Sequence, residues 1–329
     1  MSTQPAQSDE IAWFTQTFSS LADNISHAVL GKRHVVSLAV TCLVSGGHLL
    51  LEDFPGTGKT SLARSLANTV QGTSSRIQFT PDLLPSDVTG VTIYDQLEQR
   101  FKFHGGPIFA TIVLADEINR ASPKTQAALL EVMEESQVTV DGVAHPVGSP
   151  FMVIATQNPI EQAGTYRLPE AQLDRFLMKT SVGYPDFSST VALLGGEAVR
   201  DRAASVSAIV TPEVISQLAG IARRVYLEQD LLGYLARLAE RSREHPHVRL
   251  GLSVRGCLAY AHCAKTWAAS LGRNYVLPDD IKALAVPVLQ HRLLLDADAQ
   301  FSGATVAGVI DEIFAAVPAP AGRQAAYAS

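Results

Sequence analysis

The chain has 329 residues, of which 47% are hydrophobic and 18% charged, a composition typical of an ordinary globular protein with room for two domains. Its formal net charge of −6 argues against general binding to nucleic acids, because such binding depends largely on Lys and Arg side chains meeting phosphates. The three cysteines contain no C-x-x-C pair, which indicates buried side chains in a reducing compartment rather than a disulfide framework.

The N-terminal part of the chain shows no targeting or membrane segment. No basic start is followed by an apolar stretch, so no signal peptide is predicted. The apolar run over residues 35–51 is interrupted at residues 45–48 and falls short of the ~20 apolar residues that a membrane span needs. We therefore expect a cytoplasmic protein without membrane insertion, with helices over residues 11–27 and 35–43, where apolar positions recur at helical spacing.

A loop with two glycines lies between a short apolar run, residues 48–51, and a helical pattern over residues 61–67. Strand, loop and helix in this order are the context in which phosphate-binding P-loops occur. Gly56 and Gly58 let the backbone bend so that its N–H groups point at phosphate oxygens, and the start of the helix adds its positive dipole end. The sequence therefore predicts phosphate binding here; the alternative is a turn that merely resembles a P-loop.

The side chains of this loop provide the remaining chemistry. Lys59 can reach the β- and γ-phosphates of a nucleotide, and the Thr60 hydroxyl can ligate Mg²⁺. Asp53 stands where the generic G-x-x-x-x-G-K-[ST] pattern has its first glycine. The loop residues predicted to bind the nucleotide are Pro55, Gly56, Thr57, Gly58, Lys59 and Thr60.

Two acids follow a buried strand predicted over residues 111–115, downstream of a strand over residues 76–79 and a break around residues 101–106. In P-loop ATPases the first acid after such a strand helps to hold Mg²⁺, and the next can polarise a water molecule. We therefore expect Asp116, with Thr60, to bind the metal, and Glu117 to act as general base. Without the P-loop upstream this would be a weak signal, because helices often begin with acids.

The next segments contain one further candidate. A helix is predicted over residues 123–135, and Asp-Gly between alternating apolar positions predicts a β-hairpin over residues 138–147. The apolar run over residues 151–155 predicts another buried strand, which ends shortly before Asn158. This side chain could reach the γ-phosphate or the attacking water; the alternative is a turn former before proline.

The C-terminal half loses strand signals after a strand predicted over residues 178–182. Arg255 opens one of its helices, against the preference of the helix dipole, which indicates either an anionic partner or a surface salt bridge. The histidines show no pair with metal-ligand spacing. Helices are predicted over residues 188–203, 212–226, 230–245, 254–270 and 278–292.

Together these motifs resemble the MoxR-type AAA+ ATPases, which have an insertion in the second helix of the ATPase core. The resemblance implies an α/β P-loop AAA+ core with a parallel sheet flanked by helices, followed by a small all-α lid. Because the strand signals end near residue 186, we expect the core over residues 1–186 and the lid over residues 187–315, and the Ala/Pro-rich composition of residues 316–329 predicts a disordered tail. Members of the family commonly carry an acid-containing P-loop variant, as at Asp53. The segments that match are residues 50–60, 78–87, 106–110, 116–121, 123–126, 155–159 and 168–176.

The resemblance also implies roles for single residues. Gly31 lies in a turn that the family places against the adenine, and residues 88–104 hold the insertion. Asn158 is similar to the sensor-1 residue, and Arg175 to the arginine finger that is offered to a neighbouring subunit. Arg255 is similar to the sensor-2 arginine of the lid.

The function that the resemblance implies is Mg²⁺-dependent ATP hydrolysis by a hexameric ring that remodels or activates partner proteins in a chaperone-like manner. ATP and Mg²⁺ are the expected cofactors, and a protein with a von Willebrand factor A domain is the expected partner. Two other functions stay open on the motifs alone. A nucleic-acid motor is disfavoured by the acidic charge balance, and a nucleotide-gated binding module with negligible hydrolysis is disfavoured by the presence of Glu117, Asn158 and Arg175.

Overall fold

The structure is a computed structural model, and it describes residues 5–54, 56–158, 164–195 and 202–320. The chain forms two compact units. One consists of Phe18–Leu218, and the other of Met1–Thr17 together with Ala219–Ser329. The units are defined by how densely their residues pack and not by the domain boundary predicted between residues 186 and 187, which stays a prediction.

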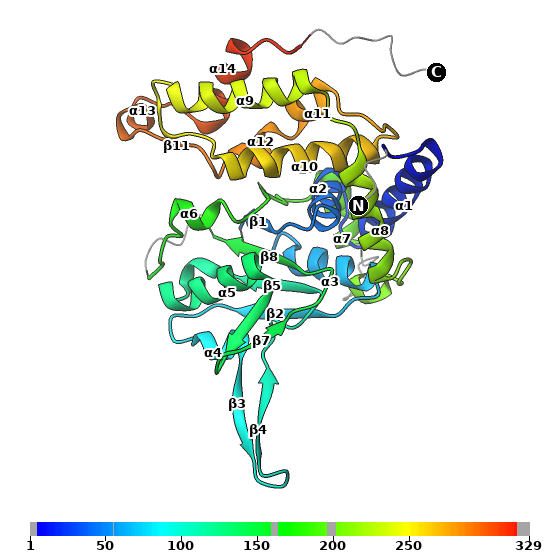
Figure 1. The fold of residues 1–329 in the computed structure, drawn as a ribbon, viewed down its shortest axis with the longest axis vertical. Coiled ribbons are helices and arrows are strands. Elements are labelled where there is room, and N and C mark those ends of the chain that lie inside the picture. The colour runs from blue at the N-terminus through cyan, green and yellow to red at the C-terminus, as the bar shows by residue number, and fades with distance from the viewer. Residues whose placement is uncertain (1–4, 55, 159–163, 196–201, 321–329) are drawn as a thin grey trace. The chain divides into compact units, whose positions relative to one another are not determined.

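The unit Phe18–Leu218 is built around a parallel sheet of five strands in the order β2-β5-β8-β1-β9 (Figure 1). This confirms the predicted α/β core. The strands are β1 (Leu49–Glu52), β2 (Ser74–Gln78), β5 (Ile112–Asp116), β8 (Met152–Gln157) and β9 (Met178–Thr180). The helices are α1 (Ser8–Ser26), α2 (Arg33–Val44), α3 (Lys59–Thr69), α4 (Pro85–Thr89), η1 (Ile118–Arg120), α5 (Pro123–Glu135), α6 (Glu170–Leu173), α7 (Phe187–Leu194), η2 (Arg202–Ser205) and α8 (Pro212–Arg224), with the unit boundaries falling inside α1 and α8.

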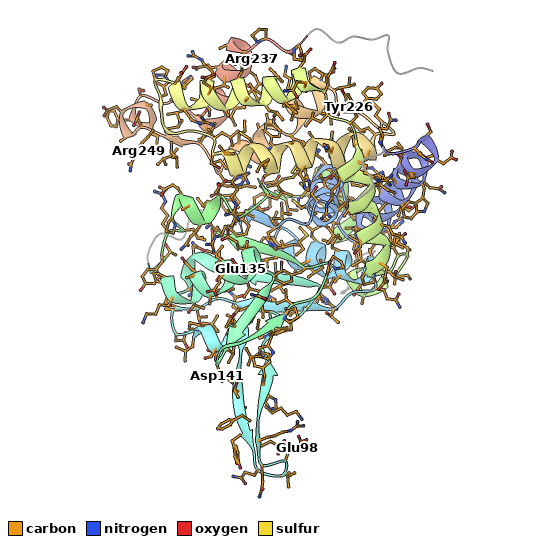
Figure 2. All side chains as sticks on the ribbon, in the orientation of Figure 1. Glu98, Glu135, Asp141, Tyr226, Arg237 and Arg249 are labelled. Carbon is orange, nitrogen blue, oxygen red and sulfur yellow. The ribbon has the colours of Figure 1, made fainter. Side chains whose placement is uncertain are left out.

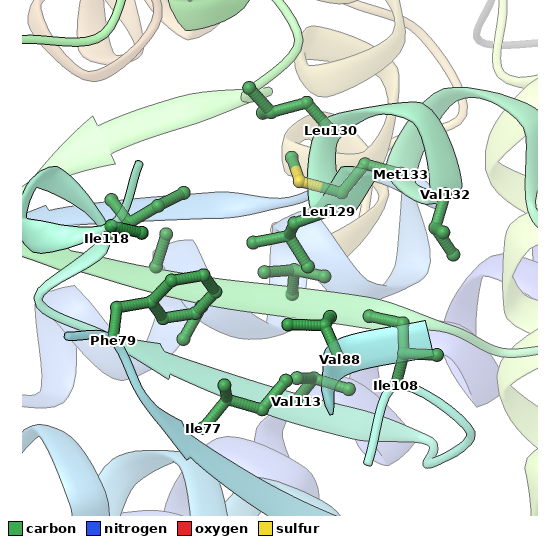
Figure 3. Packing of buried hydrophobic residues seen from close by; sticks show 14 of the residues in the cluster. Ile77, Phe79, Val88, Ile108, Val113, Ile118, Leu129, Leu130, Val132 and Met133 are labelled. Carbon is green, nitrogen blue, oxygen red and sulfur yellow. The ribbon is translucent and has the colours of Figure 1, made fainter. Parts of the chain in front are cut away.

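The three inner strands, β1, β5 and β8, are buried on both faces, which explains why they are nearly continuous apolar runs rather than alternating ones. On one face Val113 packs in a cluster with Val88 of α4 and Leu129 of α5 (Figure 3). On the opposite face Leu49 and Leu51 are fully buried as well. The inner strands therefore present mainly their ends to solvent, and polar side chains gather there.

A long two-stranded ribbon, β3 (Gly90–Asp95) paired antiparallel with β4 (Arg100–Gly105), extends away from the sheet (Figure 1), and Glu98 lies at its far end (Figure 2). The break predicted around residues 101–106 is wrong, because that stretch is strand β4. The glycines there serve a close approach of backbones rather than a turn, since a Cβ on Gly106 would lie 2.3 Å from the Val88 carbonyl oxygen.

A short hairpin of β6 (Gln137–Val140) and β7 (Val143–Pro146) follows α5. Its two turn residues, Asp141 and Gly142, have φ angles of 50° and 77°. Positive φ at both central positions is the geometry that matches the twist of a tight hairpin. The predicted hairpin is therefore confirmed.

The other unit is mainly helical. The predicted helix over residues 278–292 is two short helices, because Pro287 has no N–H to donate to the carbonyl of Ala283 and its ring would clash there. The loss of strands is also not complete, since two strands too short for a periodic signal pair antiparallel. The elements are α9 (Gln229–Glu244), β10 (Val248–Leu250), α10 (Val254–Ser270), α11 (Pro278–Ala283), α12 (Ala285–Leu289), β11 (Leu294–Leu295), α13 (Ala297–Phe301) and α14 (Val306–Ala316).

The C-terminal tail predicted over residues 316–329 is described only in part. Of the expected tail, residue 316 ends α14 and residues 321–329 lie outside the described residues. Across the described part of the chain, no helix combines the length and the apolar character that crossing a bilayer requires.

Candidate functional site

The glycine-containing loop connects β1 to α3, as the sequence predicts. Gly56 and Gly58 have φ angles of 82° and 93°, which side chains other than glycine rarely adopt. A Cβ on either glycine would meet no atom within 4 Å, so their requirement is conformational and leaves open space in front of the loop. Gly58 is also the N-cap of α3, whose first N–H groups therefore face this space. Pro55, predicted to belong to the loop, lies outside the described residues.

Asp53 has a structural role that explains the missing first glycine. One of its carboxylate oxygens accepts hydrogen bonds from the backbone N–H groups of Val182 and Gly183, at 2.6 and 2.9 Å. The other accepts from the N–H of Phe54 at 3.1 Å. The side chain is buried, so these bonds tie the start of the loop to the end of β9.

Lys59 closes the loop on itself in this structure. Its ammonium group donates to the carbonyl oxygen of Phe54 at 2.8 Å, and the Thr57 hydroxyl donates to the same oxygen at 3.2 Å. An anion in front of the loop would be within reach of the same ammonium group, which rotates freely on its stem.

The loop forms one wall of a cleft of about 410 Å³ at the carboxyl ends of the strands. Adjacent parallel strands explain this convergence, since β5 and β8 pair directly and both end at this edge. Eight of the predicted site residues line the cleft: Gly56, Thr57, Gly58, Lys59, Thr60, Asp116, Glu117 and Asn158.

Asp116 is held by two partners. The Thr156 hydroxyl donates to its Oδ1 at 2.6 Å, and the Arg76 guanidinium donates to its Oδ2 at 2.7 Å. The same Thr156 oxygen accepts from the N–H of Glu117 at 2.9 Å, so one side chain of β8 aligns both acids.

Glu117 adopts the left-handed backbone conformation, with φ 58°, which is uncommon for a residue other than glycine. Its Oε2 accepts from the Gln78 amide at 2.8 Å and from the Arg120 guanidinium at 3.0 Å. Strained backbone of this kind persists where the surroundings hold it, and it concentrates at functional sites. The geometry therefore fixes a carboxylate at the edge of the cleft through side chains of β2 and η1.

Sequence reasoning missed three of these residues, Arg76, Gln78 and Thr156, all of which line the cleft. They lie on β2 and β8, the strands on either side of β5. Once that strand order is known, polar residues near the ends of both strands are expected at this edge. The chain order alone does not reveal the neighbours, because β2 and β5 are separated by a helix and a ribbon.

The cleft combines cations and hard oxygen ligands. Lys59 and Arg76 can meet anionic groups, while the Thr60 hydroxyl and the Asp116 carboxylate are oxygen ligands of the kind that Mg²⁺ prefers. The residues present therefore fit a magnesium-bound polyphosphate, and Asp116 would exchange the Arg76 guanidinium for the metal.

Three predicted site residues are not among those that line this cleft. Arg175 follows α6 and forms an ion pair with Glu134 of α5 at 2.9 Å. Gly31 has φ 67°, and a Cβ on it would lie 2.7 Å from the Ser189 hydroxyl at the start of α7. Arg255 belongs to the other unit, in the first turn of α10, whose N-cap Ser253 accepts from the N–H of Gly256. Their roles stay predictions.

Comparisons with known proteins place this architecture among ATPases. Residues 48–178 match the family model described as "ATPase family associated with various cellular activities (AAA)", and residues 240–313 match an AAA lid domain. A crystal structure of a candidate ATPase from Cytophaga hutchinsonii superposes with a TM-score of 0.88 at 35% identity, covering 95% of this chain and 98% of that one.

Three relatives match over nearly the whole chain. The Bacillus subtilis (strain 168) protein YeaC, itself uncharacterised, is 45% identical over 303 residues, which are 92% of this chain and 95% of that protein. The chaperone MoxR1 of Mycobacterium tuberculosis is 37% identical over 325 residues, which are 96% of this chain and 86% of that protein. Protein MoxR of Paracoccus denitrificans is 30% identical over 322 residues, covering 90% of this chain and 94% of that protein.

Proposed function

Because the chain belongs to the MoxR family of AAA+ ATPases, we propose that it hydrolyses Mg²⁺–ATP in a ring of identical subunits, with each active site shared between two of them, and uses this energy to remodel or activate partner proteins. The observation that supports this most is the convergence of a phosphate-binding loop, a metal-binding carboxylate and a second carboxylate in one cleft. A module that only bound nucleotide would need no carboxylate fixed at that position.

Each residue of the cleft has a distinct task in this proposal. The N–H groups of the loop and Lys59 bind the phosphates, and Thr60 and Asp116 hold the metal. When bound, Mg²⁺ neutralises charge that develops on the phosphates and orients them. Glu117 takes the proton of the attacking water.

Neighbouring side chains control these groups. Gln78 and Arg120 hold the Glu117 carboxylate through one oxygen, so its other oxygen is available to a water molecule. Asn158, at the end of β8, would contact the γ-phosphate or that water. Thr156 keeps both acids in register with the sheet.

We assign the shared part of the site to Arg175. Its ion pair with Glu134 is partly exposed, with 27% of the arginine side chain and 36% of the glutamate side chain accessible. Arg175 is not among the residues that line its own cleft, which supports the proposal that it acts at the cleft of a neighbouring copy. A cation at the γ-phosphate stabilises the transition state, with effects of about 10³–10⁵ on the rate.

Substitution of Lys59 tests the binding step. Lys59→Ala is expected to weaken ATP binding by about tenfold or more, the equivalent of one charge-assisted hydrogen bond. Calorimetry with ATP and Mg²⁺ measures this, with Lys124→Ala, an exposed lysine at the start of α5, as the matched control. Equal affinities of Lys59→Ala and the wild type would refute the phosphate-binding role.

Substitution of Glu117 tests the chemical step. Glu117→Gln is expected to bind ATP with unchanged affinity and to hydrolyse it about 10²-fold more slowly, since the general base is lost. Single-turnover hydrolysis measures this, with the exposed Glu135→Gln as control. If Glu117→Gln turned over ATP at the wild-type rate, the base would have to be another residue.

One relative is named a chaperone, and the family resemblance implies a von Willebrand factor A domain protein as partner. Glu117→Gln loaded with ATP should retain such a protein longer than the wild type does, because hydrolysis no longer resets the complex. Equal retention by both proteins would separate partner binding from the ATP cycle.

A further inference from the structure

Three side chains with metal-ligating atoms gather in the C-terminal unit: His245, which follows α9, His247, which precedes β10, and Glu312 on α14. One ligand atom of each lies within 4.8 Å of the other two. We call this group the His245–His247–Glu312 cluster. It takes no part in the proposed ATP chemistry.

The framework holds the cluster in place by other contacts. Tyr234 of α9 and Phe314 of α14 meet edge to face, with ring centroids 6.3 Å apart. The carbonyl of His245 accepts from the N–H of Val248, and the carbonyl of His247 accepts from the N–H of Asp296. The two histidines and the helix that carries Glu312 are therefore positioned by packing and backbone bonds, as a preorganised site requires.

The hydrogen bonds within the cluster define where its protons lie. The Nδ1 of His245 accepts from the backbone N–H of His247 at 3.2 Å, so the neutral ring carries its proton on Nε2 and donates it to Glu312 at 3.0 Å. The His245 side chain is 4% exposed. The buried imidazole of His245 and the carboxylate of Glu312 therefore already lie side by side as two potential metal ligands.

The hydrogen bond between His245 and Glu312 leaves one polar atom of His247 unexplained. Its Nδ1 is buried and has no hydrogen-bond partner among the described residues. Leaving a buried polar atom unsatisfied costs about 1–3 kcal/mol, so native structures rarely keep one without a use. The ring stands at 64° to that of His245, with centroids 5.4 Å apart.

We propose that the His245–His247–Glu312 cluster binds a divalent transition-metal ion of the Zn²⁺ type. Two imidazoles and one carboxylate form a ligand set that suits Zn²⁺, with water in the fourth position. Ligand atoms of a tetrahedral zinc site lie about 3.4 Å apart, given bond lengths near 2.1 Å. The Nε2 of His245 lies 3.0 Å from the Glu312 carboxylate and the three ligand atoms lie within 4.8 Å of one another, so a small adjustment of the side chains would bring them to these distances.

Metal binding would change the tautomer of His245 and break one hydrogen bond. Coordination by the Nε2 of His245 moves the ring proton to Nδ1, which gives up the long bond from the His247 amide. We therefore expect an affinity below that of structural zinc sites with thiolate ligands. The ion would clamp α14 to the segment between α9 and β10, and would stabilise the fold in proportion to its free concentration.

The test uses the full-length protein without a histidine tag, in excess Mg²⁺ and ADP so that the oxygen ligands of the nucleotide cleft are occupied. Zn²⁺ binding is measured by calorimetry, and Co²⁺ serves as a spectroscopic probe whose visible absorption reports nitrogen coordination. The expected results are one ion per chain and a rise in the thermal unfolding temperature with Zn²⁺.

Two variants and a matched control decide the outcome. Glu312→Gln, an exposed substitution that leaves the fold intact, and His247→Gln should each weaken binding by about tenfold or more, since even changes to residues that only hydrogen-bond to metal ligands cost about 10–100-fold. Asp311→Asn, the exposed neighbour on the same helix, should bind like the wild type. The proposal is overturned if the wild type takes up no ion saturably, or if Glu312→Gln binds Zn²⁺ and Co²⁺ as tightly as the wild type.

Discussion

At the scale of single residues, the P-loop departs from the generic motif at its first position but keeps the glycines that its backbone conformation requires. Asp53 departs from the generic pattern, yet its carboxylate accepts three backbone hydrogen bonds that hold the loop against the end of β9. The glycines that matter for the shape of the loop are Gly56 and Gly58, with positive φ angles. The residue at the first position of the motif therefore holds the loop in place.

This explanation predicts that restoring the generic motif does harm. Asp53→Gly should lower the free energy of unfolding by about 2–3 kcal/mol or more, because several buried N–H groups lose a charged acceptor. Urea denaturation measures this, and Asp82→Asn, an exposed acid, serves as control. An unchanged unfolding midpoint in Asp53→Gly would show that the loop does not depend on this anchor.

A second residue-scale prediction concerns pH. His48 is fully buried; its Nδ1 accepts from the N–H of Val153 at 2.9 Å, and its Nε2 lies 3.0 Å from the carbonyl of Met133. Burial lowers the pKa of its imidazole to about 4, from a value of 6.5 in the unfolded chain. The unfolded chain therefore binds the proton more readily, and the folded state loses stability as pH falls from 6.5 towards 4.

The expected loss from this group is about 2 kcal/mol between pH 7 and pH 5. Because other groups titrate in the same range, the measurement is a comparison of urea unfolding at several pH values for the wild type and His48→Gln, whose amide can also accept and donate. The variant should depend less steeply on pH. Identical slopes for the two proteins would exclude His48 as a source of acid sensitivity.

At the scale of elements, most helices and strands of the core could be predicted, because their signals are local. The β6–β7 hairpin followed from Asp141-Gly142 between alternating side chains, and the strand–loop–helix of the P-loop from its apolar run and glycines. What failed were features set by distant parts of the chain or hidden in a few residues. A break was predicted around residues 101–106, whereas Gly106 lets the chain after β4 pass close to the backbone of Val88, and Gly105 makes room for the Phe109 ring.

The residues of the candidate site also fall into two groups, those with a local sequence signal and those that only the fold brings together. Residues with motif spacing, such as Lys59, Asp116 and Glu117, could be located from the sequence alone, and they do line the cleft. Arg76 and Gln78 could not, because they enter the cleft only through the pairing of β2 with β5. The His245–His247–Glu312 cluster was missed because the histidines were interpreted as having no metal-ligand spacing and because Glu312 lies far along the chain, on α14.

The turn of the β6–β7 hairpin gives an element-scale prediction with a matched control. Gly142 has φ 77°, and a Cβ there would meet nothing, so Gly142→Ala should cost about 1 kcal/mol from backbone conformation alone. Gly220, inside α8, also has open space but ordinary helical φ, so Gly220→Ala should stabilise by about 0.5–1 kcal/mol. Unfolding midpoints that shift in the same direction for both variants would contradict this account.

At the scale of the whole molecule, the residues proposed to bind the phosphates, hold the metal and take the proton all line one cleft. The cation expected at the γ-phosphate is the exception. Arg175 forms an ion pair with Glu134 and is not part of the cleft's lining. A single copy is therefore proposed to be an incomplete enzyme, and assembly would be what switches hydrolysis on.

Mixing two inactive variants tests this claim most directly. Arg175→Ala retains a complete cleft but offers no arginine to its neighbour, and Glu117→Gln offers the arginine but has no base. In mixed rings some clefts of Arg175→Ala subunits face the intact Arg175 of a Glu117→Gln neighbour. We predict that ATPase activity, near background for either variant alone, reappears on mixing and depends on the ratio of the two. If mass measurement shows that mixed assemblies form and the mixture stays as inactive as its components, the active site is not shared through Arg175.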